Sequence, residues 1–108
     1  MIDNDKVPEL SRKEFEDSTK KGIVLVDFFA DWCMPCIMMA PVIDELSEKF
    51  KGKIKFAKVN VDENQELAQK FSVMSIPNFV LFKDGEVSER FIGARSLEDF
   101  SEKREKHL

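Results

Sequence analysis

The residues of this chain that are best suited to chemistry are two cysteines separated by two residues. They lie in the motif Trp-Cys-Met-Pro-Cys at 32–36. The chain contains no other cysteine. The apolar run 23–29 leads into the pair, and a helix-compatible stretch that ends near residue 50 follows it. A Cys-x-x-Cys pair between a predicted strand and a predicted helix indicates dithiol redox chemistry.

Cys33 is the candidate nucleophile because it lies where the strand-to-helix loop meets the start of a helix. The free amides and the macrodipole at a helix N-terminus favour a thiolate and lower a thiol pKa below its free value of about 8.5. We expect Cys33 to be exposed and to attack a substrate disulfide. Cys36, about one helical turn later and beneath Cys33, would then attack Cys33 and release the reduced substrate.

Two other interpretations of the cysteine pair stay open at this point. The first is a structural disulfide or a pair of spectator thiols, although closing so small a loop stabilises a fold little through chain entropy. The second is zinc binding, which normally needs four ligands. The chain offers two cysteines and the distant His107, so a zinc site would require two chains to share it.

The composition indicates one globular domain over residues 1–108, with 43% hydrophobic and 35% charged residues. The net charge of −4 argues against nucleic acid as the main partner. No apolar run approaches the ~18 residues of a membrane span. The first residues lack the positive and apolar regions of a signal peptide. We therefore expect no membrane partner and a reducing, cytoplasmic location, where a cysteine pair is more often catalytic than structural.

The expected elements follow the order β-α-β-α-β-α-β-β-α. Capping patterns at Ser11–Glu14 and Asp62–Gln65 predict the starts of two helices. Strands separated by helices imply right-handed parallel crossovers, and the final hairpin adds an antiparallel part, so the sheet is mixed. The expected strands are 7–9, 23–29, 54–61, 78–82 and 86–92, and the expected helices are 11–20, one ending at 50, 62–71 and one starting at 96.

Asp27 is the only charged residue in the apolar run 23–29. Burying a carboxylate is costly, so we expect its neutral form to be favoured and its pKa to be raised. The alternative interpretation is a buried acid held by a salt bridge, with Lys58 as the partner. Helical spacing favours a packing role for Met38 and Met39.

With these features assembled, residues 7–106 resemble the thioredoxin family. The resemblance implies an α/β thioredoxin fold, with a central mixed five-stranded β-sheet flanked by four helices. The chain departs from the family pattern at Met34 in place of Gly, at Phe29 in place of Trp and at Asn78 in place of Thr. The matching features are Val26-Asp27-Phe28, Trp32-Cys33-x-Pro35-Cys36, Ala40-Pro41, Lys58, Asn60, Asp62, Ile76-Pro77, Asp84-Gly85 and Gly93.

The resemblance also implies roles for individual residues. It places Asp27 beneath Cys36, as a group that accepts and donates the proton of the resolving thiol, with Lys58 nearby. It identifies Pro77 as a cis-proline beside the sulfurs, and the backbone of Ile76 as a hydrogen-bonding edge for an extended substrate segment. The expected substrate-binding residues, with Trp32 exposed among them, are Trp32, Met34, Pro35, Ile76, Pro77, Gly93 and Ala94.

The function implied is protein disulfide reduction by a monomer that needs no cofactor and no metal. Its partners would be client proteins that contain disulfides, and a thioredoxin reductase would re-reduce it. One alternative is a glutaredoxin-like or isomerase-like protein that draws electrons from glutathione. Another is a binding or scaffold module that uses the dithiol as a redox-sensitive latch. Turnover in an insulin-type reduction assay distinguishes the enzyme from the module.

Overall fold

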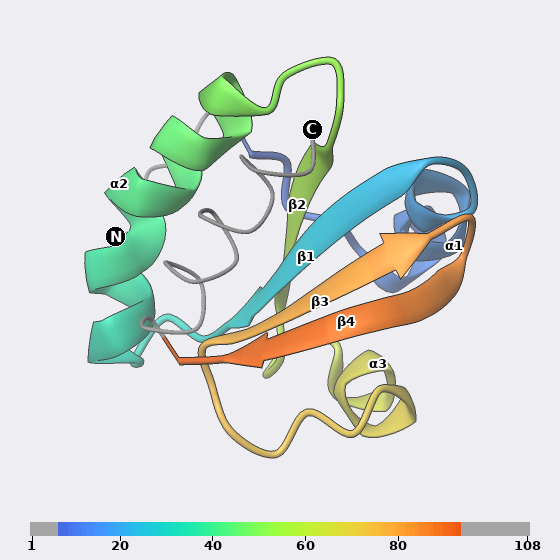
Figure 1. The fold of residues 1–108 in the computed structure, drawn as a ribbon. Helices are drawn as coiled ribbons and strands as arrows, with labels where there is room; N and C mark the ends of the chain where they lie inside the picture. Colours follow the sequence, from blue (N-terminus) through green and yellow to red (C-terminus); the bar gives the residue numbers. More distant parts are fainter. Residues whose placement is uncertain (1–6, 94–108) are drawn as a thin grey trace.

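The computed structural model describes residues 7–93, which form a central β-sheet with helices on both faces (Figure 1). The sheet has the strand order β2-β1-β3-β4, in which β1 and β2 are parallel and the other two pairs are antiparallel. The mixed sheet that the sequence predicts is therefore confirmed. In chain order the elements are α1 (Arg12–Thr19), β1 (Ile23–Phe29), α2 (Met34–Lys49), β2 (Lys55–Asn60), α3 (Gln65–Lys70), β3 (Asn78–Lys83) and β4 (Glu86–Ile92).

The central strand β1 is apolar along both faces because each face is covered by helices. Figure 1 shows α2 on one side of the sheet and α1 and α3 on the other. Leu25 packs with Ile43 of α2, whereas Val26 belongs to the cluster on the α1 and α3 face with Phe15. Asp27 has the same parity in β1 as Leu25, so its side chain lies on the α2 face.

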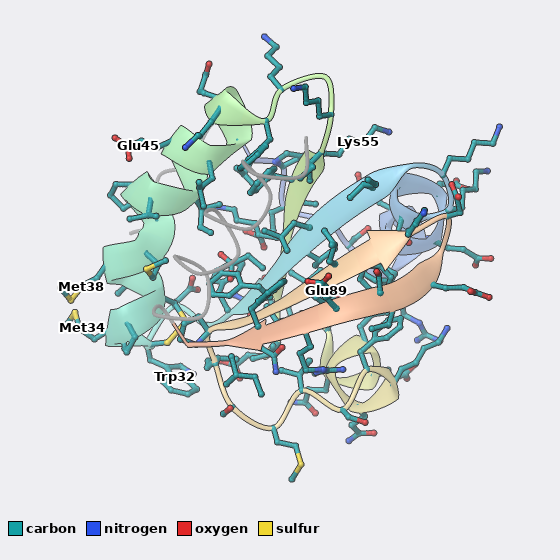
Figure 2. All side chains as sticks on the ribbon, in the orientation of Figure 1. Trp32, Met34, Met38, Glu45, Lys55 and Glu89 are labelled. Carbon is teal, nitrogen blue, oxygen red and sulfur yellow. A yellow bond between two sulfur atoms is a disulfide. The ribbon has the colours of Figure 1, made fainter. Side chains whose placement is uncertain are left out.

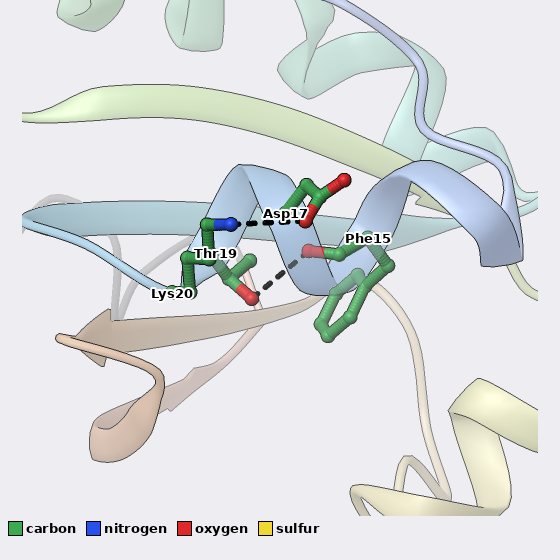
Figure 3. A network of polar contacts seen from close by, with 4 residues as sticks. All are labelled: Phe15, Asp17, Thr19 and Lys20. Atoms are coloured by element: carbon green, nitrogen blue, oxygen red, sulfur yellow. Dashed lines mark hydrogen bonds and ion pairs between the residues drawn. The ribbon is translucent and has the colours of Figure 1, made fainter.

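The helix starts and ends follow local chemistry. Glu14 accepts hydrogen bonds from the Ser11 amide at 3.0 Å and the Ser11 hydroxyl at 2.8 Å, and these bonds lower the pKa of Glu14. At the other end of α1, the buried Thr19 hydroxyl donates to the Phe15 carbonyl, while Lys20 pairs with Asp17 (Figure 3). Each contact satisfies a polar group in a terminal turn, which keeps this short helix in place.

The expected capping box at Asp62 and Gln65 is wrong, because α3 begins at Gln65 and its N-cap is Asn64. The side chain of Asn60 explains the shift. Its Oδ1 atom accepts from the Asp62 amide at 2.9 Å and from the Glu63 amide at 3.3 Å. These bonds hold the chain in a turn, so the N-cap of the helix lies two residues later than expected.

The first expected strand is reduced to an isolated parallel bridge between Glu9 and Lys58. Lys58 donates to the Pro8 carbonyl at 3.0 Å, and Leu10 donates to the Lys58 carbonyl at 2.8 Å. The next rung would need an amide at residue 8 that donates to Phe56, and proline has none. Residues 7–93 therefore contain four strands and three helices, and the helix expected from residue 96 lies outside the described residues.

Candidate active site

The two cysteines lie at the N-terminus of α2 and are joined by a disulfide, with their Cα atoms 5.2 Å apart. Cys33 is the N-cap residue with an extended backbone, and Met34 is the first helical residue. The Cys36 amide donates a hydrogen bond to Cys33 Sγ at 3.3 Å. The sulfur thus occupies the position in which a side-chain oxygen usually caps a helix.

The expectation that Cys33 is exposed above a buried Cys36 is wrong for this disulfide form. Cys33 is 4% exposed and Cys36 is 3% exposed. Both pack in a cluster with Phe29 and Ala30, and Ile76 lies against that cluster. Phe29 and Ala30 directly precede the motif in the sequence, whereas Ile76 comes from a distant segment. Solvent exposure therefore does not distinguish the two cysteines. Their positions do, because the sulfur of Cys33 accepts a hydrogen bond from an amide at the start of α2.

Asp27 is buried in β1, and in the register of the sheet it is paired with Lys58 of β2. Burial raises the pKa of Asp27 to about 7, and the positive charge of Lys58 opposes this rise. Asp27 Oδ1 has no hydrogen-bond partner among residues 7–93. Within the same residues, no ion pair joins Asp27 to Lys58, whose ammonium lies 5.4 Å from the ring centroid of Phe29. The geometry favours a neutral acid over the salt-bridged alternative.

The loop before β3 approaches the disulfide through Ile76, the residue before Pro77. The Ile76–Pro77 peptide bond is cis, as the resemblance to the thioredoxin family implies. Ile76 packs against the cluster that contains both cysteines. Gly93 donates from its amide to the Pro77 carbonyl at 2.9 Å, which ties the end of β4 to this loop. Ala94, the last expected residue of the apolar surface, lies outside the described residues.

Apolar side chains surround the start of α2 on the solvent side (Figure 2). Trp32 is 70% exposed and Met34 is 63% exposed, and Pro35 is also exposed. The expected exposure of Trp32 is confirmed. Its indole Nε1 donates to Asp62 Oδ2 at 2.8 Å, so the ring is held by one polar contact while its faces meet solvent. These side chains form an apolar surface beside the disulfide.

Met38 belongs to this surface, although the sequence favours a packing role for it. Met38 is 71% exposed, whereas its neighbour Met39 is 7% exposed. The residue spacing indicates the exposure of Met38. Met38 follows Met34 by four residues and falls outside the buried series that contains Met39 and Ile43. Two consecutive methionines cannot share one face of a helix, so only one of them packs on the sheet.

Arg90 of β4 is a second residue that the sequence does not reveal. Its guanidinium donates to the carbonyls of Phe71 and Ser72 and, at 3.5 Å, to Oδ1 of the buried Asn78. These contacts connect β4 to both ends of the loop that carries Ile76. Asn78 stands where the family usually has Thr, and its longer amide reaches toward this arginine.

Within residues 7–93, no group of three or more His, Cys, Asp or Glu side chains is placed to hold a metal ion. In the same part of the chain, no helix is both long and apolar enough to cross a bilayer.

A disulfide at a helix N-terminus, beside a cis-proline loop on a mixed sheet, defines the class as a thiol–disulfide oxidoreductase of the thioredoxin fold. The Thioredoxin family model matches residues 6–106. The chain is 48% identical over 96 residues to thioredoxin of Bacillus subtilis, covering 89% of this chain and 92% of that protein. It is 44% identical over 102 residues to thioredoxin of Staphylococcus saprophyticus, covering 94% and 98% respectively. The chain belongs to the thioredoxin family.

Membership of this family decides between the functions that the sequence left open. The chain is a protein disulfide reductase, and its Cys-x-x-Cys pair is the redox-active group. The glutathione-linked, isomerase-like and scaffold alternatives are not favoured by these similarities.

Proposed function

We propose that Cys33 is the nucleophile and Cys36 the resolving thiol in the reduction of client protein disulfides. The observation that carries this assignment is the hydrogen bond from the Cys36 amide to Cys33 Sγ at the N-cap of α2. In the dithiol form, the same amide and the helix N-terminus stabilise a thiolate on Cys33. Cys36 lies within the first turn, where its sulfur reaches Cys33 without a large movement of the backbone.

The reaction consists of two thiol–disulfide exchanges. The Cys33 thiolate attacks one sulfur of the client disulfide and forms a mixed disulfide, while the other client sulfur leaves as a thiolate and takes a proton. Cys36 then loses its proton and attacks Cys33 Sγ, which releases the second client thiol. The enzyme is left oxidised, in the disulfide form that the structure shows. Two electrons pass to the client in each cycle.

Asp27 is the proposed acceptor of the Cys36 proton, and Lys58 the charged group that moderates it. Asp27 lies on the sheet face that α2 covers, and its raised pKa of about 7 allows both proton uptake and release near neutral pH. Lys58 favours the ionised form of this carboxyl group. Together they provide a buried acid whose protonation state can change near neutral pH.

The proposed client-binding surface is the apolar area around the disulfide. Exposed apolar side chains favour contact with the varied surfaces of client proteins, and a flexible methionine adapts to them. The backbone of Ile76 would pair with an extended client segment. The residues that we assign to client binding are Trp32, Met34, Pro35, Ile76, Pro77, Gly93 and Ala94, of which Pro77 is buried and Ala94 lies outside the described residues.

We further propose that a thioredoxin reductase supplies the electrons, and that the chain acts as a cytoplasmic monomer, a single domain over residues 1–108, without a cofactor. Its similarity to bacterial thioredoxins supports a thioredoxin reductase as the electron donor. The chain has only two cysteines, both in the redox pair, and this supports a reducing location. The net charge of −4 supports protein clients rather than nucleic acid.

Trapping of the mixed disulfide tests the assigned roles. Cys36→Ser should accumulate a covalent complex with a disulfide-containing client, because the attack that resolves the complex is lost. Cys33→Ser should accumulate none. Non-reducing electrophoresis and intact mass measure the complex, and insulin reduction driven by dithiothreitol or a thioredoxin reductase measures turnover. The opposite trapping pattern would reverse the two roles.

A further inference from the structure

In the disulfide form, the sulfur atoms that meet solvent belong to methionines rather than to cysteines. The residues Cys33 and Cys36 are 4% and 3% exposed, and their sulfurs are already bonded to each other. Met34 is 63% exposed and Met38 is 71% exposed. An oxidant that reaches this end of the molecule therefore meets thioethers before it meets the redox pair.

The two methionines form one site because of the helix geometry. Positions four residues apart lie on the same face of an α-helix, so Met34 and Met38 are neighbours on α2. Figure 2 shows their side chains together on the outer side of the helix start, with Trp32 on the loop before it. Met34 lies between the two cysteines in the sequence, within the small ring that their disulfide closes. A modification of the Met34 side chain therefore changes the surface directly next to the reacting sulfurs.

We propose that Met34 and Met38 are a peroxide-sensitive modification site that controls the binding of protein clients. This inference rests on the proposed function of the surface around the disulfide. Each thioether sulfur attacks the O–O bond of hydrogen peroxide or an organic hydroperoxide and gains one oxygen atom. The sulfur is oxidised by two electrons to a sulfoxide, and the peroxide is reduced to water or an alcohol.

The sulfoxide changes the surface without touching the cysteines. Oxidation replaces a flexible apolar side chain by a polar one, whose S=O group must lose water when a client covers it. The first turn of α2 carries no acidic residue, and its exposed side chains are those of Met34 and Pro35. A client protein covers this area when its disulfide reaches Cys33, whereas a small disulfide covers little of it. Oxidation therefore slows reduction of proteins but not of small molecules.

The test uses the full chain in its disulfide form, in which the cysteines are protected, treated with hydrogen peroxide and then desalted. Peptide mass mapping should find one added oxygen on Met34 and one on Met38, and none on Met39, which is 7% exposed. The kcat/KM for insulin, with dithiothreitol as reductant, should fall by about tenfold. The rate with a small aromatic disulfide should not change. Treatment with reductases for both sulfoxide epimers should restore insulin reduction.

Two variants locate the effect, each compared with itself before and after peroxide. Met34→Leu combined with Met38→Leu should show no loss on treatment, because no thioether remains there. Met74→Leu, which removes another methionine that is 93% exposed, should lose activity as the wild type does. Unchanged insulin reduction by wild type with both methionines oxidised would overturn the inference, and so would protection by Met74→Leu. No insulin reduction before peroxide would instead overturn the proposed function, while the mass map would still decide whether this site is modified.

Discussion

At the scale of single residues, the buried carboxyl group of Asp27 has the clearest energetic consequence. Its pKa of about 7 in the folded chain compares with 3.8 for the same group in water, because burial penalises the charged form. Between these two pH values the unfolded chain releases this proton while the folded chain retains it. The contribution of Asp27 therefore makes the fold less stable as pH rises through this window, and the penalty becomes constant above it.

Asp27→Asn should remove this pH dependence. The variant should gain stability relative to wild type as pH rises from about 4 to about 8, by up to about 4 kcal/mol, because the amide carries no charge to desolvate. Guanidinium unfolding of both proteins across this range measures the difference. Asp31→Asn, which changes an exposed carboxyl group on the neighbouring loop, is the matched control. A difference between Asp27→Asn and wild type that stays constant with pH would show that Asp27 is ionised in the fold throughout.

The same substitution tests the proton transfer that we propose. Asp27→Asn should slow the release of client from the mixed disulfide at neutral pH, because the amide cannot accept the Cys36 proton. General acid–base catalysis typically contributes about 100-fold or more, so the slowing should be large. Rapid-quench measurement of the mixed disulfide reports this step directly. An unchanged rate would show that Cys36 loses its proton by another route.

At the scale of elements, the end of α3 sets the path toward Ile76. The Ser72 amide donates to the Gln69 carbonyl at 3.1 Å, and the Val73 amide donates to the Ala68 carbonyl at 2.8 Å. These two bonds form a Schellman motif, which requires a left-handed residue after the helix. Ser72 fills this position with φ of 55°, where glycine is the usual residue. The loop therefore begins at a conformation that a side chain disfavours.

Ser72→Gly should raise the free energy of unfolding by about 0.5–1 kcal/mol, because relief of the left-handed strain exceeds the added chain entropy of glycine. Urea denaturation measures the change. Ser75→Gly lies in the same loop, also exposed and without a positive φ, and should instead lower stability. Equal effects of the two glycines would mean that the conformation of Ser72 is not what limits this loop.

At the scale of the whole molecule, the sheet carries an apolar cluster on each face, and the redox pair lies at the N-terminus of α2. Phe82 is fully buried in the cluster opposite α2. Its ring lies 5.5 Å from that of Phe15 and 5.1 Å from that of Phe71, both in edge contacts. These ring contacts pack α1 and the end of α3 against the sheet.

Phe82→Ala should lower the free energy of unfolding by about 3–5 kcal/mol through lost burial and the cavity that remains. Trp32, the only tryptophan of the chain, reports the active-site end, and circular dichroism reports the whole fold. Their transitions should coincide in wild type and variant if both clusters unfold together. Val87→Ala on the exposed side of β4 is the control and should cost less than about 1 kcal/mol. Separate transitions would show that the active-site end unfolds independently.

Much of this architecture could be predicted because local patterns settled it. The strands Ile23–Phe29 and Glu86–Ile92 match the predicted bounds. A glycine with positive φ precedes the first strand at Gly22, and two such glycines flank the second at Gly85 and Gly93. The turn between β3 and β4 follows from Asp84 and Gly85, which both adopt positive φ. The predictions of element bounds failed where another interaction overrode the local sequence pattern. Asn60 moved the start of α3, and Pro8 ended a strand that its neighbours favoured.

The sequence alone determined the redox chemistry, because a Cys-x-x-Cys pair at a helix start needs only local spacing, and it determined that Asp27 would be a buried acid, because one charge stands in an apolar strand. Only the tertiary structure decided which sulfurs meet solvent. Cys33 is covered by Phe29 and by a loop some forty residues away in the chain, while Met38 is left outside because α2 has one face to bury. The burial of a residue depends on the segments packed around it, and these segments come together only when the sheet has formed.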